Sequence, residues 1–362
     1  MPADPALLKL AEYKRAIDDD LQTYAAYLRK TSAEQFGQEV TEADTDIFLD
    51  ILERGGKRIR GALVMAGYEM CGGTDRKMVV QAARAIEMIH AYALIVDDIQ
   101  DRSALRRGKP TAHELLAAYH GKHGFRGDAH HAGISLALSA AMVGSHAAQT
   151  VLANLDTDPE ARLKALSITN RTMVITAHGQ TLDILNELVE QPSEEDIERV
   201  LEWKTALYTV INPLHVGMVL AGAGCEATDA ITPYGHFAGK AFQITDDILG
   251  IFGEEKDLGK TPGDDIREGK GTLLVLYALE HAKPADKAFL QKCLGSPGLT
   301  LAEFERCKEI IKTSGALDYA RNEAGKQLDG ALAALGKARG LWSQEGTDFL
   351  KGLARALHNR VA

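Results

Sequence analysis

The chain has 362 residues, of which 45% are hydrophobic and 25% are charged. This balance is that of an ordinary globular protein, and it excludes bulk disorder, a collagen-like repeat and a disulfide-dense scaffold. The formal net charge of −10 argues against a nucleic-acid surface or an anionic membrane as the main partner, but it leaves anionic substrates open because charge can be local.

Helix signals run from one end of the chain to the other. Apolar residues recur at helical spacings within residues 6–30. Similar patterns rich in Ala and Leu predict further helices over residues 75–101, 132–154, 158–190, 194–223 and 234–252.

Prolines mark the expected helix boundaries. Pro159 stands where a helix would start, and Pro192 and Pro233 are expected to fall between helices. Pro213 lies inside an apolar pattern and predicts a kink or a break at Asn212.

The remaining patterns give no sign of a sheet or of separate domains. No run alternates with period two, and residues 283–299 are expected only to connect two helices. No linker rich in Gly, Ser or Pro marks a boundary. The predicted fold class is therefore all-α, with residues 1–362 forming one domain of long helices around a core.

Three features predict the compartment. The first residues show no basic stretch followed by an apolar segment, so no signal peptide is expected. The most apolar stretch, residues 132–144, is shorter than the about 20 residues that a membrane span needs. None of the four cysteines belongs to a CxxC pair, which favours reduced thiols. We expect a cytoplasmic protein without stable membrane insertion.

The segment RGGKRIRGAL, residues 54–63, is the first that carries chemistry. Its two glycines free the backbone, and Lys57 and Arg60 are expected on one face of the helix that follows. Such a helix start can bind an anion. Taken alone, a basic first turn is often only a solvated surface.

The segment IHAYALIVDDIQD, residues 89–101, ends a predicted helix with paired carboxylates. Asp97 and Asp101 lie one turn apart on the same face, where they repel each other at the negative end of the helix dipole. A divalent cation would neutralise them, and oxygen ligands suit Mg²⁺. Asp98 points about 100° away, so we expect it behind the ligands or at the surface. The alternative is a solvated acidic helix end.

Two arginines and a second acidic helix end strengthen the metal hypothesis. Arg106 and Arg107 follow the first pair and offer bidentate donors to a diphosphate. Asp246 and Asp247 end another apolar stretch, which a loop rich in glycine and charge follows. We expect the two acidic helices to face each other with metal ions between them.

These motifs together resemble the trans-isoprenyl (polyprenyl) diphosphate synthases, and most of all the geranylgeranyl diphosphate synthases. They follow in order from GGKRIR at residue 55 to DDIREGKGT at residue 272, with RRGKPTAH, HGQTLD and EWKT between them. The resemblance implies a bundle of helices around a central apolar cavity. It also implies a homodimer and a magnesium-dependent transferase that condenses isopentenyl diphosphate with an allylic diphosphate.

The resemblance assigns a role to each matched residue. It implies that Asp97, Asp101 and Asp246 bind magnesium, with three ions per active site. It implies that Arg106, Lys204 and Lys260 contact the allylic diphosphate. It also implies that isopentenyl diphosphate is held by four residues: Lys57, Arg60, His90 and Arg107. Thr205 and Gln243 would turn their side-chain dipoles toward the allylic cation. Gln180, Asp183 and Asp247 would have supporting roles.

Product length is expected to depend on the helix that ends in the first acidic pair. The resemblance places the floor of the pocket at Tyr92 and, one turn deeper, at Met88, while the neighbouring residue is the small Ala93. One turn rises about 5.4 Å, close to one isoprene unit. This pattern favours geranylgeranyl diphosphate (C20), with farnesyl and longer products left open.

Departures and alternatives remain. Gly250 stands where many members carry a third aspartate, Val96 where many carry histidine, and Gly133-Ile134 where many have Gly-Asp. A terpene cyclase and a non-catalytic partner subunit of a heteromeric synthase are the competing functions. A zinc site is conceivable at the histidines of residues 120–131, although no cysteine completes it: His120, His123, His130 and His131.

Overall fold

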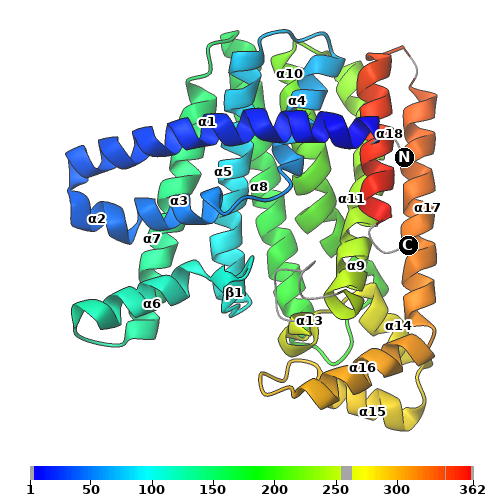
Figure 1. Ribbon diagram of the computed structural model, residues 1–362. Coiled ribbons are helices and arrows are strands. Elements are labelled where there is room, and N and C mark those ends of the chain that lie inside the picture. The colour runs from blue at the N-terminus through cyan, green and yellow to red at the C-terminus, as the bar shows by residue number, and fades with distance from the viewer. Residues whose placement is uncertain (1–3, 254–262, 339, 360–362) are drawn as a thin grey trace. The chain divides into compact units, whose positions relative to one another are not determined.

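The computed structural model describes residues 4–253, 263–338 and 340–359, which are helical almost throughout (Figure 1). The chain divides into two compact units. The N-terminal unit comprises Leu8–Leu166 and Pro213–Gly222. The C-terminal unit comprises Met1–Leu7, Ser167–Asn212 and Ala223–Ala362.

The N-terminal unit is built around the long helix α5. Its elements are most of α1 (Pro5–Phe36), then α2 (Gln38–Ala43), α3 (Thr45–Glu53), α4 (Ile59–Met70), α5 (Arg76–Gln100), β1 (Leu105–Arg106), β2 (Lys109–Pro110), α6 (Ala112–His123), α7 (Ala129–Ala153), the start of α8 (Pro159–Glu187) and most of α10 (Asn212–Leu220). Helix α5 packs against α3, α4 and α7, and α7 packs against α6 (Figure 1). Apolar residues of α5 such as Ile86 and Ile95 are fully buried, so this helix forms the core of the unit.

Two glycines let α4 and α10 approach to backbone contact. A Cβ atom at Gly67 would lie 2.5 Å from the carbonyl oxygen of Leu214. A Cβ atom at Gly217 would lie 2.0 Å from the carbonyl oxygen of Val64. Glycine is required at both positions because any side chain would separate the helices, and α4 carries part of the basic motif at its start.

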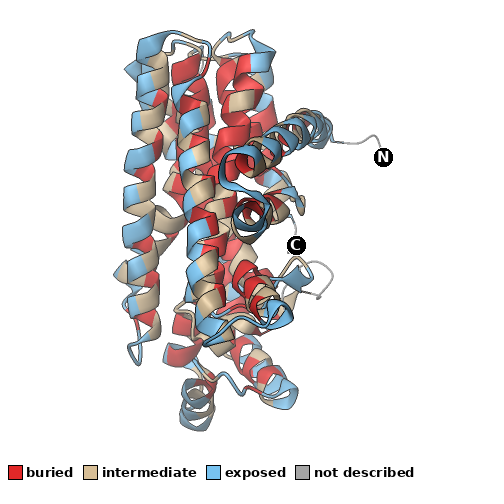
Figure 2. Ribbon diagram, turned by 90° about the vertical axis from the view of Figure 1, so that its left-hand side faces the viewer, coloured by how far each residue is buried: buried red, intermediate tan, exposed pale blue. Residues whose placement is uncertain are grey.

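The C-terminal unit is built around α11 (Cys225–Phe252). Its other elements are the rest of α8, then α9 (Glu194–Val200), the π-helix η1 (Leu201–Ile211), α13 (Asp264–Glu268), α14 (Leu273–His281), α15 (Pro284–Cys293), α16 (Leu301–Thr313), α17 (Ala316–Lys337) and α18 (Gln344–His358). Helix α11 packs against η1, α17 and α18. The core of this unit contains Ile248, Leu274 and Phe304. Long helices of both units bury one face and expose the other (Figure 2).

The all-α prediction is confirmed, but three local expectations are wrong. Pro233 lies inside α11 instead of preceding it. Proline has no N–H, so the carbonyl of Asp229, four residues earlier, has no helical partner, and Asp229 is exposed. Residues 283–299 contain α15, which Pro284 opens at its first turn. Strands β1 and β2 form a small antiparallel pair although no sheet was expected.

Pro213 does not break the chain at Asn212. The helix is instead wound as a π-helix over Leu201–Ile211 and continues into α10. The N–H of Asn212 donates to the carbonyl of Leu207, five residues earlier. The wider winding changes the hydrogen-bond register just before the proline, which removes the need for a break.

By length and composition alone, α5 and α7 of the described chain could each cross a membrane. Their apolar windows are longer than the stretch that the sequence pattern indicated. In α5, 67% of the window is buried within the structure, as in a core helix, compared with 39% in α7. The absence of stable membrane insertion stays a prediction, as does the single domain.

Candidate active site

The first acidic pair lies where the sequence pattern places it. Asp97 belongs to the last turn of α5, and Asp101 is the residue that ends the helix. The N–H of Asp101 donates to the carbonyl of Asp97 at 2.8 Å, so the two residues are one turn apart. Both are half-buried, which leaves their carboxylates close to the surface of the N-terminal unit.

Asp98 is fully buried, so of the two places expected for it the structure shows the one behind the predicted ligands and not the one at the surface. Its Oδ1 accepts from Nε of Arg106 at 2.8 Å and also from the second terminal nitrogen of that guanidinium. The same nitrogen lies 3.3 Å from Oδ2 of Asp97. Burial lowers the pKa of Arg106, but Asp98, Asp97 and Asp101 outweigh it and hold that pKa above its usual range. Asp98 therefore fixes a charged Arg106 beside the acidic pair.

A tight hairpin presents the neighbouring arginine. Arg107 and Gly108 form the turn between β1 and β2, and both have positive φ, at 55° and 72°. This conformation matches the twist of the paired strands. The guanidinium of Arg107 donates to the carbonyl of Gly55 and lies so near Gly56 that a Cβ atom there would be 2.8 Å from Nη2. The hairpin and the glycine loop therefore support each other.

Lys57 lies in this glycine loop and not on the helix. The loop includes positive φ values at Gly55 and Gly56, and also at Arg58, so α4 begins only at Ile59. The expectation that Lys57 and Arg60 share a helix face is therefore wrong. Lys57 is exposed, as a residue that meets a substrate from solvent should be.

A buried ion-pair network, which the sequence reasoning missed, holds the loop in place. Arg58 donates to Asp18 at 2.8 Å, to Glu87 at 3.4 Å and to the carbonyl of Leu52 at 2.9 Å. Glu87 of α5 also accepts from the N–H of Gly61 at 2.8 Å. Glu87 is an acidic residue inside a mostly apolar stretch of α5. An acidic residue in such a stretch indicates a buried ion pair, and this was the signal that the sequence offered.

Arg60 and His90 meet beside this loop. Nη1 of Arg60 lies 3.2 Å from Nε2 of His90. Burial, followed by the charges of Arg60, Arg107, Arg106 and Arg58, holds the pKa of His90 well below its usual range. His90 is therefore neutral at pH 7 and accepts a hydrogen bond from Arg60. The structure thus gathers several cations around His90, of which Arg58 is paired with Asp18 and Glu87, and Arg106 with Asp98.

In the C-terminal unit, Lys204 pairs with Asp183. Nζ of Lys204 lies 2.6 Å from Oδ2 of Asp183, which is buried. Nζ of Lys270 lies 3.7 Å from the same oxygen and 3.4 Å from Glu187. Gln180 lies about one turn before Asp183 on α8. Its Nε2 is buried without a hydrogen-bond partner.

Thr205 and Gln243 form a hydrogen-bonded chain that reaches Asp247. The hydroxyl of Thr205 donates to Oε1 of Gln243 at 2.8 Å, and Nε2 of Gln243 donates to Oδ1 of Asp247 at 2.8 Å. Lys204 and Thr205 both belong to the π-helix η1, a form that is frequent at functional sites. The polar atoms of Thr205 and Gln243 thus have fixed directions.

The second acidic pair belongs to a crowd of carboxylates. Burial raises the pKa of Asp247 to about 8, and the charges of Asp265, Asp246 and Asp183 add to this effect, while the hydrogen bond from Gln243 opposes it. Like charges at this density favour either a proton or a bound cation.

The predicted metal ligands, Asp97 and Asp101 in one unit and Asp246 in the other, fit magnesium by their chemistry. All three offer carboxylate oxygens, which Mg²⁺ prefers. Across residues 4–253, 263–338 and 340–359, no three His, Cys, Asp or Glu side chains converge on one metal position. Mg²⁺ keeps several waters and is commonly held by one or two carboxylates together with phosphate oxygens, so it needs no such convergence.

The residues predicted to set product length lie on α5. Met88 is fully buried, and the half-buried Tyr92 forms a side-chain hydrogen bond with Ser145 of α7. Burial raises the pKa of the Tyr92 phenol. The ring is therefore held at the contact between α5 and α7. Lys260, predicted to contact the allylic diphosphate, lies outside the described residues.

The histidines of α6 and α7 form no metal site within the described chain. His120 is hydrogen-bonded to the carbonyl of Arg126 at 3.1 Å and His123 to the carbonyl of Tyr119 at 2.9 Å. Each bond takes up only one of the two nitrogens of its ring.

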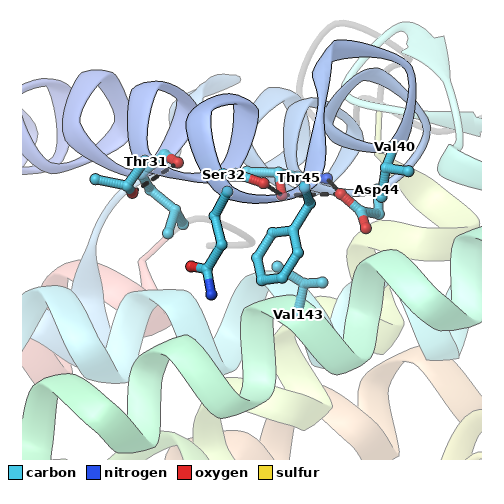
Figure 3. Close-up of a pocket in the computed structure, with 9 residues that line it drawn as sticks. Thr31, Ser32, Val40, Asp44, Thr45 and Val143 are labelled. Carbon is cyan, nitrogen blue, oxygen red and sulfur yellow. Dashed lines mark hydrogen bonds between the residues drawn. The ribbon is translucent and has the colours of Figure 1, made fainter.

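A pocket of about 320 Å³ lies in the N-terminal unit, between α1, α2, α3 and α7 (Figure 3). Its lining residues are Leu28, Thr31, Ser32, Gln35, Phe36, Val40, Asp44, Thr45 and Val143. The hydroxyls of Ser32 and Thr45 are hydrogen-bonded there at 3.0 Å. None of the predicted site residues lines this pocket.

Comparisons with known proteins identify the family. Residues 43–311 match the family model described as polyprenyl synthetase. A geranylgeranyl diphosphate synthase of Saccharolobus solfataricus is 35% identical over 285 residues, which are 78% of this chain and 80% of that protein. A geranylfarnesyl diphosphate synthase of Aeropyrum pernix is 33% identical over 279 residues, which are 76% and 81% of the two chains.

A solved structure is similar along almost the whole chain. It is the crystal structure of geranylgeranyl pyrophosphate synthase from Corynebacterium glutamicum, complexed with isoprenyl diphosphate and magnesium. It has a TM-score of 0.92 and 32% sequence identity, and the match covers 97% of this chain and 99% of that chain. The chain therefore belongs to the polyprenyl synthetase family and is a prenyl transferase with the all-α fold of these synthases.

Proposed function

We propose that this enzyme condenses isopentenyl diphosphate with an allylic diphosphate and releases geranylgeranyl diphosphate. In this proposal Asp97, Asp101 and Asp246 bind magnesium, which withdraws charge from the leaving diphosphate when bound. The number of ions, expected to be three, belongs to the proposal. Arg106, Lys204 and Lys260 hold the oxygens of the same diphosphate.

The residues of the chain supply orientation and charge, and no catalytic nucleophile is needed. Arg106 keeps its charge and direction through Asp98, so its guanidinium can stabilise charge that develops on the diphosphate. Thr205 and Gln243 hold their dipoles fixed toward the allylic carbon after the C–O bond breaks. The alkene of isopentenyl diphosphate then attacks this carbon, and the released diphosphate accepts the proton that is lost.

The single observation that carries the proposal is the cation cluster around His90. Arg60 contacts His90, and Arg107 is close enough to lower the pKa of its ring. These groups, with Lys57, suit a second diphosphate beside the acidic pair. A terpene cyclase ionises one diphosphate and needs no second anion site, so this cluster favours the synthase.

Product analysis tests the proposal. The purified chain is incubated with Mg²⁺, isopentenyl diphosphate and a C5, C10 or C15 allylic diphosphate, and products are identified by mass spectrometry. We expect chain growth to C20 from each primer, and no growth when isopentenyl diphosphate is omitted. A cyclic hydrocarbon made without isopentenyl diphosphate would support the cyclase instead. Turnover only after addition of another synthase subunit would support the partner-subunit alternative.

The assembly state and the location also belong to the proposal. We expect a homodimer, which light scattering of the purified protein would measure. Two large apolar side chains of α7, Leu138 and Met142, are exposed in the single chain. We expect the protein in the cytoplasmic fraction after cell fractionation, and recovery with the membranes would contradict this.

A further inference from the structure

Gly250 has no room for a side chain, because a carboxylate already fills the space. Gly250 belongs to the last turns of α11. A Cβ atom there would lie 2.1 Å from Oδ2 and 3.1 Å from Cγ of Asp265. The first distance is far below van der Waals contact, so the carboxyl group of Asp265 occupies the position that a residue-250 side chain would take.

Helix α13 fixes Asp265 in this place. It begins after Gly263, whose φ is 88°, and ends at Gly269, whose φ is 81°. The carbonyl of Asp265 accepts from the N–H of Gly269 at 3.1 Å and from that of Lys270 at 2.9 Å. The neighbouring Ile266 is fully buried in the core of the C-terminal unit. The backbone of Asp265 is therefore held firmly, while its carboxylate can rotate.

Position 250 belongs to the acidic face of α11. It lies four residues after Asp246, so both residues point to the same side of the helix. The charge of Asp265 also acts on the nearby Asp247. The carboxylate of Asp265 is thus added to the same group of acids from a different helix.

We propose that Asp265 supplies from α13 the carboxylate that the second acidic motif lacks at residue 250, and that glycine is required there to admit it. The inference rests on the proposed function, in which Asp246 binds magnesium. Asp265 acts beside the ion in this proposal, either as a ligand or by holding its bound water. A magnesium site with a glycine at this position then keeps its full carboxylate count.

A small side chain at residue 250 should fold normally, because the clashing atoms are the far end of a flexible side chain and not backbone. Gly250→Ala should turn the Asp265 carboxylate away and put nothing in its place. Gly250→Asp should turn it away and replace it. The two substitutions therefore separate a steric effect from a charge effect at one position.

Magnesium binding is measured by isothermal titration calorimetry, with inorganic pyrophosphate present, for Gly250→Ala, Gly250→Asp, Asp265→Ala and the double variant Gly250→Asp/Asp265→Ala. We expect Gly250→Ala and Asp265→Ala each to weaken binding by about 10-fold, the lower end of the range for residues that support a metal ligand. Gly250→Asp should bind nearly as the parent chain does, and the double variant should recover most of the loss caused by Asp265→Ala.

Gly325→Ala is the matched control, because Gly325 lies in α17 with open space around it and should leave binding unchanged. Circular dichroism checks that all variants are folded. Full affinity in both Gly250→Ala and Asp265→Ala overturns the inference, as does a double variant no better than Asp265→Ala. If the parent chain itself fails to bind magnesium with pyrophosphate, the proposed function fails as well, so the two failures are distinguishable.

Discussion

At the scale of single residues, burial sets the protonation of the candidate site. Burial, and then the surrounding arginines, lower the pKa of His90, so its neutral form is favoured and it can accept a hydrogen bond from Arg60. Arg106 is held charged by the buried Asp98. One residue is therefore kept neutral and the other charged within the same unit, so donors and acceptors are set before a substrate arrives.

The depressed pKa of His90 predicts a loss of stability in acid. Below pH 6.5 the unfolded chain takes up a proton at this histidine more readily than the folded chain does. The free energy of unfolding therefore decreases as the pH is lowered. The loss grows as the pH falls below the pKa of the unfolded imidazole. His90→Gln keeps an acceptor for Arg60 but cannot titrate. Urea unfolding should therefore show a smaller pH dependence for His90→Gln, and an equal dependence would contradict the pKa shift.

At the scale of helices, close packing and winding place the side chains. Glycines bring α4 against α10, and a π-helix aims both Lys204 and Thr205. Neither device adds a polar contact of its own. Their effect is to set where the first turn of α4 and the polar face of η1 lie.

Gly217→Ala should destabilise the chain strongly, because its Cβ atom would lie 2.0 Å from a backbone carbonyl that cannot rotate away. We expect a loss of about 3 kcal/mol, as for overpacked cores. Gly121→Ala in α6 has open space around it and serves as the control. Thermal or denaturant unfolding measures both variants. If the free energy of unfolding of Gly217→Ala falls no more than that of the control, α4 and α10 can separate freely.

Tyr92→Ala should lengthen the product by about one isoprene unit, because it removes a ring from α5 and exposes the turn below it. Tyr92→Phe keeps the ring and removes only the hydrogen bond to Ser145. We therefore expect the phenylalanine variant to make the parent product. Mass spectrometry of the products compares the two, and an unchanged product with Tyr92→Ala would show that the floor lies elsewhere.

At the scale of the whole molecule, the net charge is −10, yet local cations form the predicted diphosphate sites. The predicted metal ligands are divided between the two units, with Asp97 and Asp101 in one and Asp246 in the other. Binding of a ligand to the folded chain should raise its free energy of unfolding.

Mg²⁺ and pyrophosphate together should raise the melting temperature more than the sum of their separate effects. At 100-fold excess over the dissociation constant, the free energy of unfolding should rise by about 2.7 kcal/mol. Differential scanning calorimetry measures the shift. Asp97→Asn and Asp246→Asn should each reduce it, and a full shift in either variant would remove that residue from the proposed ligands.

The sequence alone determined the features that depend on neighbours along the chain. Helical spacing follows from backbone hydrogen bonds across four residues, so the one-turn separation of Asp97 and Asp101 could be predicted. The order of motifs likewise indicated the family. Boundaries were less certain, as Pro233 inside α11 demonstrates.

Only the tertiary structure decided the contacts between residues far apart in the chain. The bonds from Arg58 to Glu87 and from Arg107 to the loop at Gly55, and the approach of Asp265 to Gly250, join segments whose distance in space no local pattern encodes. Packing of whole helices sets these distances. The π-winding of η1 is also of this kind, because η1 packs against α11, which follows it later in the chain.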